Sequence, residues 1–319
     1  MAVKILGISY GTKNGNNDAM CKEALMGAKE AGADIEFIQM QDLEIKHCTG
    51  CIACVKALFS GKGNICVLKD DMAWLLDKML DADGIVSAVP IFEKGSTGLF
   101  HTITDRFGPR MDRGNNIVAD KMSKEAGGPG VDPRILQEKP VSYIAIGGSD
   151  WATRVQTDCA MQAMTPKWTV IDNKVFGWSK GIMMNDDAIA QCHQVGINLV
   201  EAAEANLAGK EMVYKGEPGI CPHCHSKEFY IDPANNYAAV CDLCGMIGEL
   251  VKLDDGSITF KFPEEQLEHA HDTIPGKFIH ADDIQRNEGK LSAAQKTPEF
   301  KARKKAYMEF IQGTKPERA

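Results

Sequence analysis

Through residues 1–212, short apolar runs alternate with segments of helical periodicity. The apolar runs cover residues 3–9, 35–40, 84–92, 141–148 and 168–176. The segments between them space their apolar residues three or four apart, as in Met72, Leu75, Leu76, Met79 and Leu80. Strands that alternate with helices are joined by right-handed crossovers, so they form a parallel sheet with helices on both faces. The pattern therefore predicts an α/β fold.

Five strands of this kind indicate a flavodoxin-like sandwich over residues 1–212. The segment 108–140 is rich in Gly, Pro and charged residues and is predicted to be a long loop. A small metal-binding domain is expected over residues 213–262, followed by a helical tail over residues 263–319. In the tail, Thr297 as N-cap, Pro298 in the first turn and Gly313 as terminator predict a final helix.

Composition narrows the class of protein. A chain of 319 residues that is 44% hydrophobic has enough apolar residues for a substantial core. The net charge of -8 and pI near 5.6 argue against a nucleic-acid-binding protein with a basic surface. No apolar stretch approaches the length of a membrane-spanning helix, and the N-terminal run is too short for a signal peptide. We therefore expect a cytoplasmic protein without nucleic-acid or membrane partners.

The eleven cysteines indicate metal binding more than disulfide bonding. Eight of them fall in Cys-x-x-Cys clusters, whereas disulfide frameworks are typical of small secreted chains. The other three, Cys21, Cys159 and Cys192, are expected to be ordinary buried residues.

The second cysteine set has the spacing of a structural zinc site. Two Cys-x-x-Cys pairs with a hairpin-length segment between them are typical of a zinc ribbon, and the predicted ligands are Cys221, Cys224, Cys241 and Cys244. Four thiolates leave no open position for a substrate, so the metal is expected to be structural. A rubredoxin-like iron site is the alternative, because Gly245 follows the second pair, although His225 follows the first.

The segment Ser9–Asn17 follows the first predicted strand and opens the first helix. Its backbone N–H groups can therefore face an anion at the positive end of the helix. It lacks both the Walker lysine pattern and G-x-G-x-x-G, which disfavours ATP and dinucleotide binding. The loops 90–98 and 147–151 follow the third and fourth strands and reach the same sheet edge. Three such loops suit a planar ring that carries a phosphate.

Four motifs together resemble the NADPH-dependent FMN reductase and iron-sulfur flavoprotein group. They are "SYGTKNGNN", "CTGCIACVKALFSGKGNICVLKDDM", "AVPIF" and the pair Asp105-Arg106, which is interpreted as a helix ion pair. Tyr10, Gly11 and Thr12 stand where this group usually has Ser, Pro and Arg, and Asn17 where it has Thr or Ser; Lys13 is a candidate replacement cation. The resemblance covers about the first 210 residues.

The resemblance implies that FMN is the cofactor. Around its phosphate it places Ser9, Thr12, Lys13, Asn14, Asn16 and Asn17. Near its ring it places Pro90, Ile91, Phe92, Glu93, Gly147, Gly148, Ser149 and Trp151. Tyr10 and His101 are further candidates for the substrate pocket. The resemblance also implies a homodimer or homotetramer.

The first cysteine set, Cys48, Cys51, Cys54 and Cys66, follows the second predicted strand on the same sheet edge. The first three are spaced as in ferredoxin-type runs, and Cys66 is a candidate fourth ligand. A 4Fe-4S cluster, redox-active thiols and zinc are the three interpretations, and the wide gap before Cys66 counts against a cluster.

Two functions remain open. The first is an FMN-dependent NAD(P)H-type oxidoreductase that reduces a small organic or quinone-like substrate, with the cluster as a candidate electron relay. The alternative is an iron-sulfur flavoprotein that carries electrons between ferredoxin-like partners. The long C-terminal extension favours the enzyme, because it can cover a pocket, whereas a carrier benefits from an exposed flavin.

Overall fold

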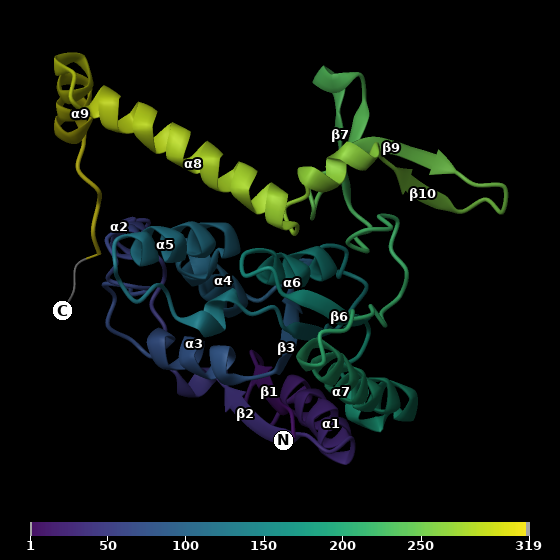
Figure 1. Cartoon of the computed structure of the whole chain (residues 1–319). Coiled ribbons are helices and arrows are strands. Elements are labelled where there is room, and N and C mark those ends of the chain that lie inside the picture. Colours follow the sequence, from purple (N-terminus) through teal and green to yellow (C-terminus); the bar gives the residue numbers. More distant parts are fainter. Residues whose placement is uncertain (1, 317–319) are drawn as a thin grey trace. The chain divides into compact units, whose positions relative to one another are not determined.

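The computed structural model describes residues 2–316, and its main element is a parallel sheet in the order β2-β1-β3-β5-β6 (Figure 1). Its strands are β1 (Lys4–Ser9), β2 (Asp34–Gln39), β3 (Gly84–Phe92), β5 (Pro140–Ile146) and β6 (Thr169–Phe176). A short strand, β4 (Gly95–Ser96), pairs antiparallel with the end of β3. The predicted flavodoxin-like sheet is therefore confirmed.

The strands are apolar on both sides because helices cover both faces of the sheet (Figure 1). One face packs on α1 (Asn16–Glu30) and α7 (Asp186–Leu207), and the other on α3 (Met72–Asp81), α4 (Gly98–Met111) and α6 (Val155–Met164). Side chains alternate between the two layers: Ile85 and Val89 point to one core, and Val86 to the other.

Glycine sets how closely α1 and α7 approach. A Cβ atom at Gly196 of α7 would lie 1.7 Å from the carbonyl oxygen of Ala24 in α1. Any larger residue would force the helices apart.

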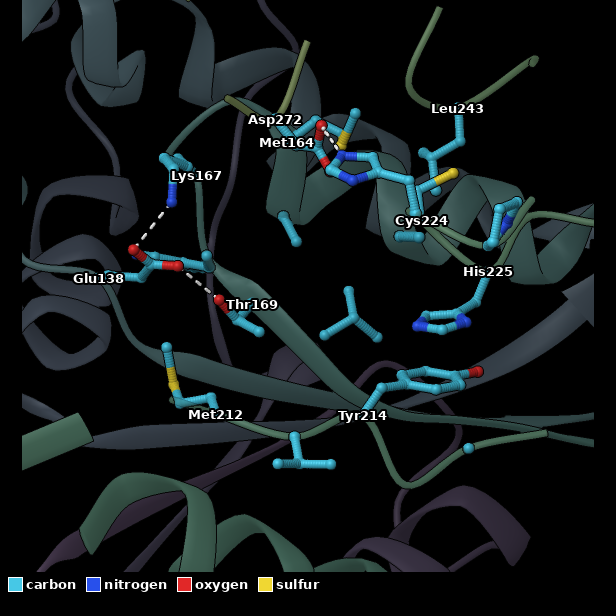
Figure 2. Close-up of a pocket in the computed structure, with 18 of the residues that line it drawn as sticks. Glu138, Met164, Lys167, Thr169, Met212, Tyr214, Cys224, His225, Leu243 and Asp272 are labelled. Atoms are coloured by element: carbon cyan, nitrogen blue, oxygen red, sulfur yellow. Dashed lines mark hydrogen bonds and ion pairs between the residues drawn. The ribbon is translucent and has the colours of Figure 1, made fainter. Parts of the chain in front are cut away.

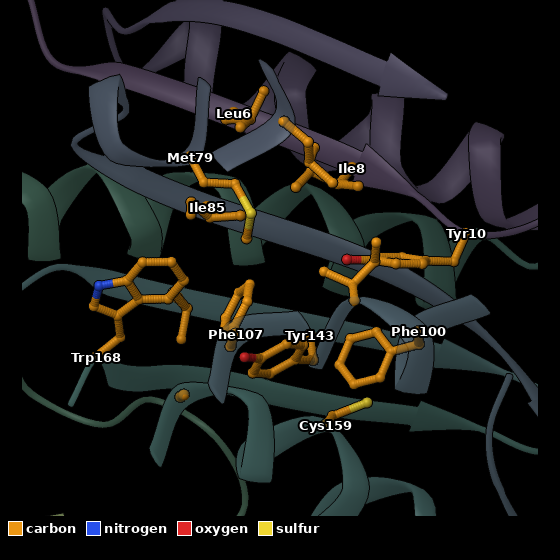
Figure 3. Close-up of a cluster of buried hydrophobic side chains, with 14 of the residues drawn as sticks. Leu6, Ile8, Tyr10, Met79, Ile85, Phe100, Phe107, Tyr143, Cys159 and Trp168 are labelled. Atoms are coloured by element: carbon orange, nitrogen blue, oxygen red, sulfur yellow. The ribbon is translucent and has the colours of Figure 1, made fainter. Parts of the chain in front are cut away.

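On the other face of the sheet, the core contains aromatic rings around Phe100. This ring meets Tyr10 edge-on at a centroid distance of 5.0 Å and Tyr143 at 6.1 Å (Figure 3). Cys21, Cys159 and Cys192 are fully buried, as expected.

The prediction of a long loop over residues 108–140 is wrong. The segment contains α5 (Arg113–Glu125) and a 3-10 turn, η2 (Pro133–Leu136). Inside α4, Gly108, with a φ of +39°, and Pro109 kink the helical path. Asp112 then caps α5 by accepting a hydrogen bond of 2.8 Å from the backbone N–H of Asn115. The glycines and proline thus mark a helix kink and helix boundaries within the segment.

A second, antiparallel sheet has the order β10-β9-β8-β7. Its strands are β7 (Phe229–Asp232), β8 (Ala238–Cys241), β9 (Ile247–Lys252) and β10 (Ile258–Lys261). A third hydrophobic core lies between this sheet and α6. In it, Met164 of α6 packs with residues of the cysteine-rich segment such as Leu243 and Phe260.

Contacts divide the chain into two compact units, Met1–Lys277 and Phe278–Ala319. The expected three-part division at 212 and 262 stays a prediction. The tail contains α8 (Ile274–Gln295), whose extent was not foreseen, and α9 (Pro298–Phe310), capped by the Thr297 hydroxyl as expected. Within the first unit, the start of α8 is held by Lys277, whose ammonium lies 3.2 Å from the Asp112 carboxylate, both buried.

Candidate functional site

Three loops meet at the carboxyl edge of the parallel sheet. The register pairs Ser9 of β1 with Ala88 of β3, and Pro90 of β3 with Ile146 of β5. The chain after β1, β3 and β5 therefore leaves the sheet at neighbouring points. In an open α/β sheet this edge is where ligands bind.

The loop after β1 is organised from beneath by Asp18, a buried residue in the first turn of α1. Its carboxylate accepts hydrogen bonds from the Ser9 hydroxyl at 2.5 Å, the backbone N–H of Asn14 at 2.8 Å and the amide of Gln39 at 2.5 Å. The Ser9 side chain is fully buried, so it supports the loop and does not open toward solvent. Asp18 was not singled out in the sequence because an acidic residue is unexpected beside a phosphate.

The exposed side of this loop fits a phosphate and a ribityl chain. Thr12, Lys13 and Asn14 are exposed, and the first-turn N–H groups of α1 have no acceptor within the helix. Asn17 is 8% exposed, and its side-chain oxygen has no hydrogen-bond partner among the described residues. A ribityl hydroxyl can donate a hydrogen bond to this oxygen, and the amide N–H₂ of the same side chain can donate to a phosphate oxygen. Lys13 is paired with Asp42.

A second cation, Lys180, approaches the same edge from the segment after β6. The side-chain amide of Asn16 donates a 2.9 Å hydrogen bond to the Lys180 carbonyl, which ties that segment to the start of α1. The Lys180 side chain crosses Gly148, where a Cβ atom would lie 2.9 Å from Lys180 Cε. Sequence reasoning missed Lys180, because only the fold brings its carbonyl to Asn16 and its side chain over Gly148.

The loop after β3 is a tight hairpin. Ile91 pairs with Ser96 and Phe92 with Gly95, while Glu93 and Lys94 turn the chain with φ values of 48° and 70°. The exposed fractions of Phe92 and Trp151 are 63% and 59%, and Lys94 lies 5.5 Å from the Trp151 ring. Trp178, at 74%, is a further exposed aromatic residue that sequence reasoning did not select.

Of the two further pocket candidates, Tyr10 is buried and His101 is accessible. Tyr10 is only 3% exposed and packs on Phe100 inside the core, so its prediction as a pocket residue is wrong. Burial raises the pKa of the Tyr10 hydroxyl above its usual value. His101 is half exposed, and its Nε2 lies 3.0 Å from the Ser96 hydroxyl and 3.5 Å from the Asp158 carboxylate.

The interpretation of Asp105-Arg106 as an ion pair is also wrong. Arg106 pairs with Asp70 at 2.6 Å, and both side chains are almost fully buried, at 2% and 1% exposed. Asp70 also accepts from the backbone N–H groups of Lys46 at 2.8 Å and Met72 at 3.3 Å. Burial opposes ionisation, but the hydrogen bond from Arg106 holds the pKa of Asp70 below its usual value.

Arg106 also anchors the first cysteine set, with Nη2 3.6 Å from the sulfur of Cys66. Cys48 and Cys51 are exposed, while Cys54 and Cys66 are half-buried. In the described part of the chain, no three of these thiols lie close enough together to hold a single ion. A 4Fe-4S cluster distributes its thiolates over several iron atoms. The geometry therefore disfavours zinc here and leaves a cluster as a proposal.

The second cysteine set does form a compact site. The sulfurs of Cys221, Cys224, Cys241 and Cys244 all lie within 4.8 Å of one another. The Cys224 and Cys241 sulfurs are 3.4 Å apart, and the Cys221 and Cys244 sulfurs 4.0 Å. Hydrogen bonds from the neighbouring thiols, Cys221 first, lower the pKa of Cys241. Four sulfurs this close suit one tetrahedral metal ion.

The two cysteine knuckles have the same backbone geometry despite different sequences. The backbone N–H of His225 donates to the Cys221 carbonyl at 3.0 Å, and that of Gly245 donates to the Cys241 carbonyl at 3.0 Å. Both residues are left-handed, with φ values of 61° and 78°. His225 thus adopts a glycine-like conformation, and its ring stacks on Tyr214 at 3.8 Å.

A cavity of about 680 Å³ lies beside the cysteine site (Figure 2). Glu138 and Thr169, which line it, stand at the amino ends of β5 and β6. Figure 2 shows the Glu138 carboxylate bridged to Lys167 and Thr169, with the Tyr214 and His225 rings on the opposite side. This cavity is at the opposite end of the strands from the three loops, so it is separate from the candidate flavin site.

Comparison with known proteins identifies the family. The family model for NADPH-dependent FMN reductases matches residues 3–182. The chain belongs to this family. It is therefore a flavin-dependent oxidoreductase whose cofactor is FMN, as the resemblance implied. Which of the predicted residues touch the cofactor stays a prediction.

Three relatives of this family member are informative. A solved structure described as a flavone reductase has 53% identity and a TM-score of 0.88, covering 99% of this chain and 100% of that one. A flavone synthase from Aspergillus candidus is 27% identical over 271 residues, 81% of each chain. An iron-sulfur flavoprotein from Archaeoglobus fulgidus is 28% identical over 218 residues, 64% of this chain and 96% of the relative.

Among the described residues, no helix has both the length and the apolar content needed to cross a membrane.

Proposed function

We propose that this protein is an FMN-dependent reductase of flavones that saturates their C2–C3 double bond. The observation that carries the proposal is the 53% identity to a flavone reductase along 99% of the chain. The similarity includes the cysteine-rich ribbon and the tail, which the family match over residues 3–182 does not reach. The name of the Aspergillus candidus relative also places a flavone in its reaction.

The exposed aromatic residues at the candidate site suit such a substrate. A flavone is a planar fused ring with a phenyl substituent, and flat aromatic side chains bind such surfaces by stacking. Phe92 is the last residue of β3, Trp151 comes from the loop after β5, and Trp178 from the segment after β6. All three lie at or beyond the carboxyl ends of their strands, the edge at which open α/β sheets bind ligands.

The chain's own residues would hold FMN and orient the flavone. Bound and reduced, FMN supplies a hydride equivalent. The first turn of α1, Thr12 and Asn17 are proposed to hold the phosphate and ribityl groups, with Lys180 as the nearby cation. The β3–β4 hairpin and the 147–151 loop would flank the ring and leave its open face to the flavone. NAD(P)H is the proposed reductant.

The test is anaerobic turnover of the FMN-loaded protein. NADPH or NADH, flavone and protein are mixed, and the flavanone formed is measured by chromatography. The proposal expects flavanone in an amount that matches the nicotinamide oxidised. Nicotinamide oxidation that reduces quinones or ferricyanide but yields no flavanone would reject it.

Electron transfer is the second candidate function, favoured by the Archaeoglobus fulgidus iron-sulfur flavoprotein, which aligns over 96% of its length. In that case a 4Fe-4S cluster at Cys48, Cys51, Cys54 and Cys66 would exchange electrons with a ferredoxin-like partner. Iron and sulfide analysis of anaerobically purified protein separates the two candidates. Stoichiometric iron and sulfide with reduction by ferredoxin but not NAD(P)H would favour the carrier.

For the second cysteine set we propose structural zinc. Its four thiolates complete a closed shell, and the site is next to a packed core, not at the flavin edge. One zinc and no iron at this site is the expected metal analysis, whereas iron with a rubredoxin-type spectrum would support the alternative. A homodimer or homotetramer is also proposed from the family, to be tested by light scattering.

A further inference from the structure

The proposed function, on which this inference rests, leaves one chemical requirement open. Saturating the C2–C3 bond of a flavone takes a hydride at C2 and a proton at C3, the carbon next to the ketone. The hydride comes from the flavin, but the proton needs a separate acid. A side chain placed as a general acid typically accelerates such a step by about 10²–10⁴.

His101 is an ionisable side chain that is both accessible and fixed at the candidate site. It lies in the first turn of α4, and its side chain is 47% exposed. Its Nε2 is 3.0 Å from the Ser96 hydroxyl and 3.5 Å from the Asp158 carboxylate. The imidazole therefore has a defined position and still reaches solvent, from which it can recover a proton.

Asp158 links His101 to the hairpin that is predicted to flank the ring. Its side chain is 12% exposed, and it accepts a 2.9 Å hydrogen bond from the backbone N–H of Ser96. Ser96 pairs with Ile91, a predicted ring contact. A Cβ atom at Gly95 would lie 2.3 Å from the Asp158 carboxylate, so glycine permits this close approach.

Two charged side chains of the α6 region lie around the imidazole. Asp158 of α6 faces it directly, and Arg154, one turn earlier, lies 3.6 Å from the other oxygen of that carboxylate. Ser96 of β4 is the neutral neighbour. The Asp158 carboxylate is thus placed to orient the imidazole, and Arg154 holds its other oxygen.

We propose that His101 is the catalytic acid that protonates C3 of the flavone, and that Ser96 and Asp158 are positioning residues for it. As the hydride bonds to C2, the C2–C3 π electrons shift toward C3 and the ketone. An N–H bond of the imidazolium breaks, its proton forms the new C3–H bond, and the neutral imidazole takes a proton from solvent. Reduced FMN would supply the two electrons of the hydride, and the flavone would become a flavanone.

The test compares His101→Gln with wild type in separate half-reactions of the FMN-loaded protein. Reduction by NAD(P)H and reoxidation by ferricyanide need no carbon protonation, so both are expected to keep wild-type rates. Reoxidation by flavone is expected to slow by about 10²-fold or more. Asp158→Asn should slow the same step less and shift its pH profile. His193→Gln is the matched control, because that histidine pairs with Glu23 between α1 and α7.

A labelling experiment separates proton delivery from a merely structural role. In D₂O, wild-type protein should place deuterium on one face of C3, as seen by NMR of the flavanone. The His101→Gln product, formed by protonation from solvent, should be a mixture of molecules labelled on one or the other face of C3. Wild-type flavone rates together with single-face labelling in this variant would overturn the proposal.

The failure of the proposed function is distinguishable from failure of this inference. Wild-type protein that reacts with ferricyanide but not with flavone would reject the flavone assignment alone. The same variants are then compared on 2-cyclohexenone, an enone that also needs a proton beside its ketone. Equal rates for wild type and His101→Gln on that enone, or reduction of neither enone by wild type, would reject the role of His101.

Discussion

Neutralising Asp70 should destabilise the protein far more than neutralising Asp105, the residue next to Arg106 in the sequence. Asp70 is 2.6 Å from Arg106 with both side chains nearly fully buried, and Arg110, 5% exposed, lies four residues further along the chain, beyond the kink at Gly108. Asp70→Asn would leave two buried guanidinium groups without this carboxylate. Breaking a buried ion pair by removing one partner costs about 3–5 kcal/mol. Because whole-domain stability is about 5–15 kcal/mol, the loss is readily measurable.

The assay is urea unfolding of the FMN-loaded protein, followed by circular dichroism. Asp105→Asn is the matched control, because Asp105 is exposed and Arg106 forms its ion pair with Asp70. It should change the free energy of unfolding by less than about 0.5 kcal/mol. A loss for Asp105→Asn equal to that for Asp70→Asn would refute the assignment of the ion pair, as would a loss below about 1 kcal/mol for Asp70→Asn.

The Asp70 pair also predicts a pH dependence. The folded-state pKa of Asp70 lies below the ordinary value of 3.8, so its contribution to stability is fully present above that value. As pH falls further, through the folded-state pKa, the contribution is lost. Asp70→Asn should therefore remove part of the acid limb of the stability profile. An unchanged acid limb would contradict the role assigned to this carboxylate.

Three further predictions concern the cofactor, the metal and α7. Lys180→Met should raise the Kd for FMN by about ten- to a hundredfold, measured by quenching of flavin fluorescence, because one charge-assisted contact is worth about 1.5–3 kcal/mol. Cys241→Ser should lose the bound zinc by elemental analysis and lower Tm, whereas Cys48→Ser should retain it. The hydrogen bond to Glu23 raises the pKa of His193, so the pair's contribution to stability is fully present below pH 6.5 and is lost as pH rises through the folded-state pKa. In Glu23→Gln this pH-dependent contribution, measured by unfolding, should be smaller, with only Glu30 left as an acidic partner.

Each of these has a control or a contradicting result. Lys13→Met serves beside Lys180→Met, since the Lys13 ammonium already pairs with Asp42, and equal effects of the two would remove the special role of Lys180. Full zinc occupancy in Cys241→Ser would contradict the four-sulfur site. A pH profile that is the same in wild type and Glu23→Gln would contradict the His193 assignment.

The parallel sheet was predictable because its signal is local and repeated. A continuous apolar run such as 84–92 indicates a strand that is buried on both faces. The periodic segments between the runs indicate helices that are buried on one face only. The predicted loop over 108–140 is wrong because Gly108 and Pro109 only kink the chain inside α4, and a further helix begins at Arg113. The α8 helix was missed because its polar, mixed sequence carries no clear apolar face.

The candidate site was only partly predictable because its contacts join distant segments. The spacing of Cys221, Cys224, Cys241 and Cys244 identified the metal site, since each pair is a local turn. By contrast, 36 residues separate Arg106 from Asp70, and the approach of Lys180 to Asn16 spans 164. Asp105 is the neighbour of Arg106 in the sequence, but in the folded chain the buried partner of Arg106 is Asp70.

The central claim, that flavone is the substrate of this family member, is tested most directly by one rapid-mixing experiment. The FMN-loaded protein is reduced anaerobically with one equivalent of NADPH and mixed with excess flavone, and the absorbance of oxidised flavin is followed. The account predicts that this absorbance returns as a stoichiometric amount of flavanone forms. Flavin that stays reduced in flavone, yet is reoxidised at once by ferricyanide, would contradict it.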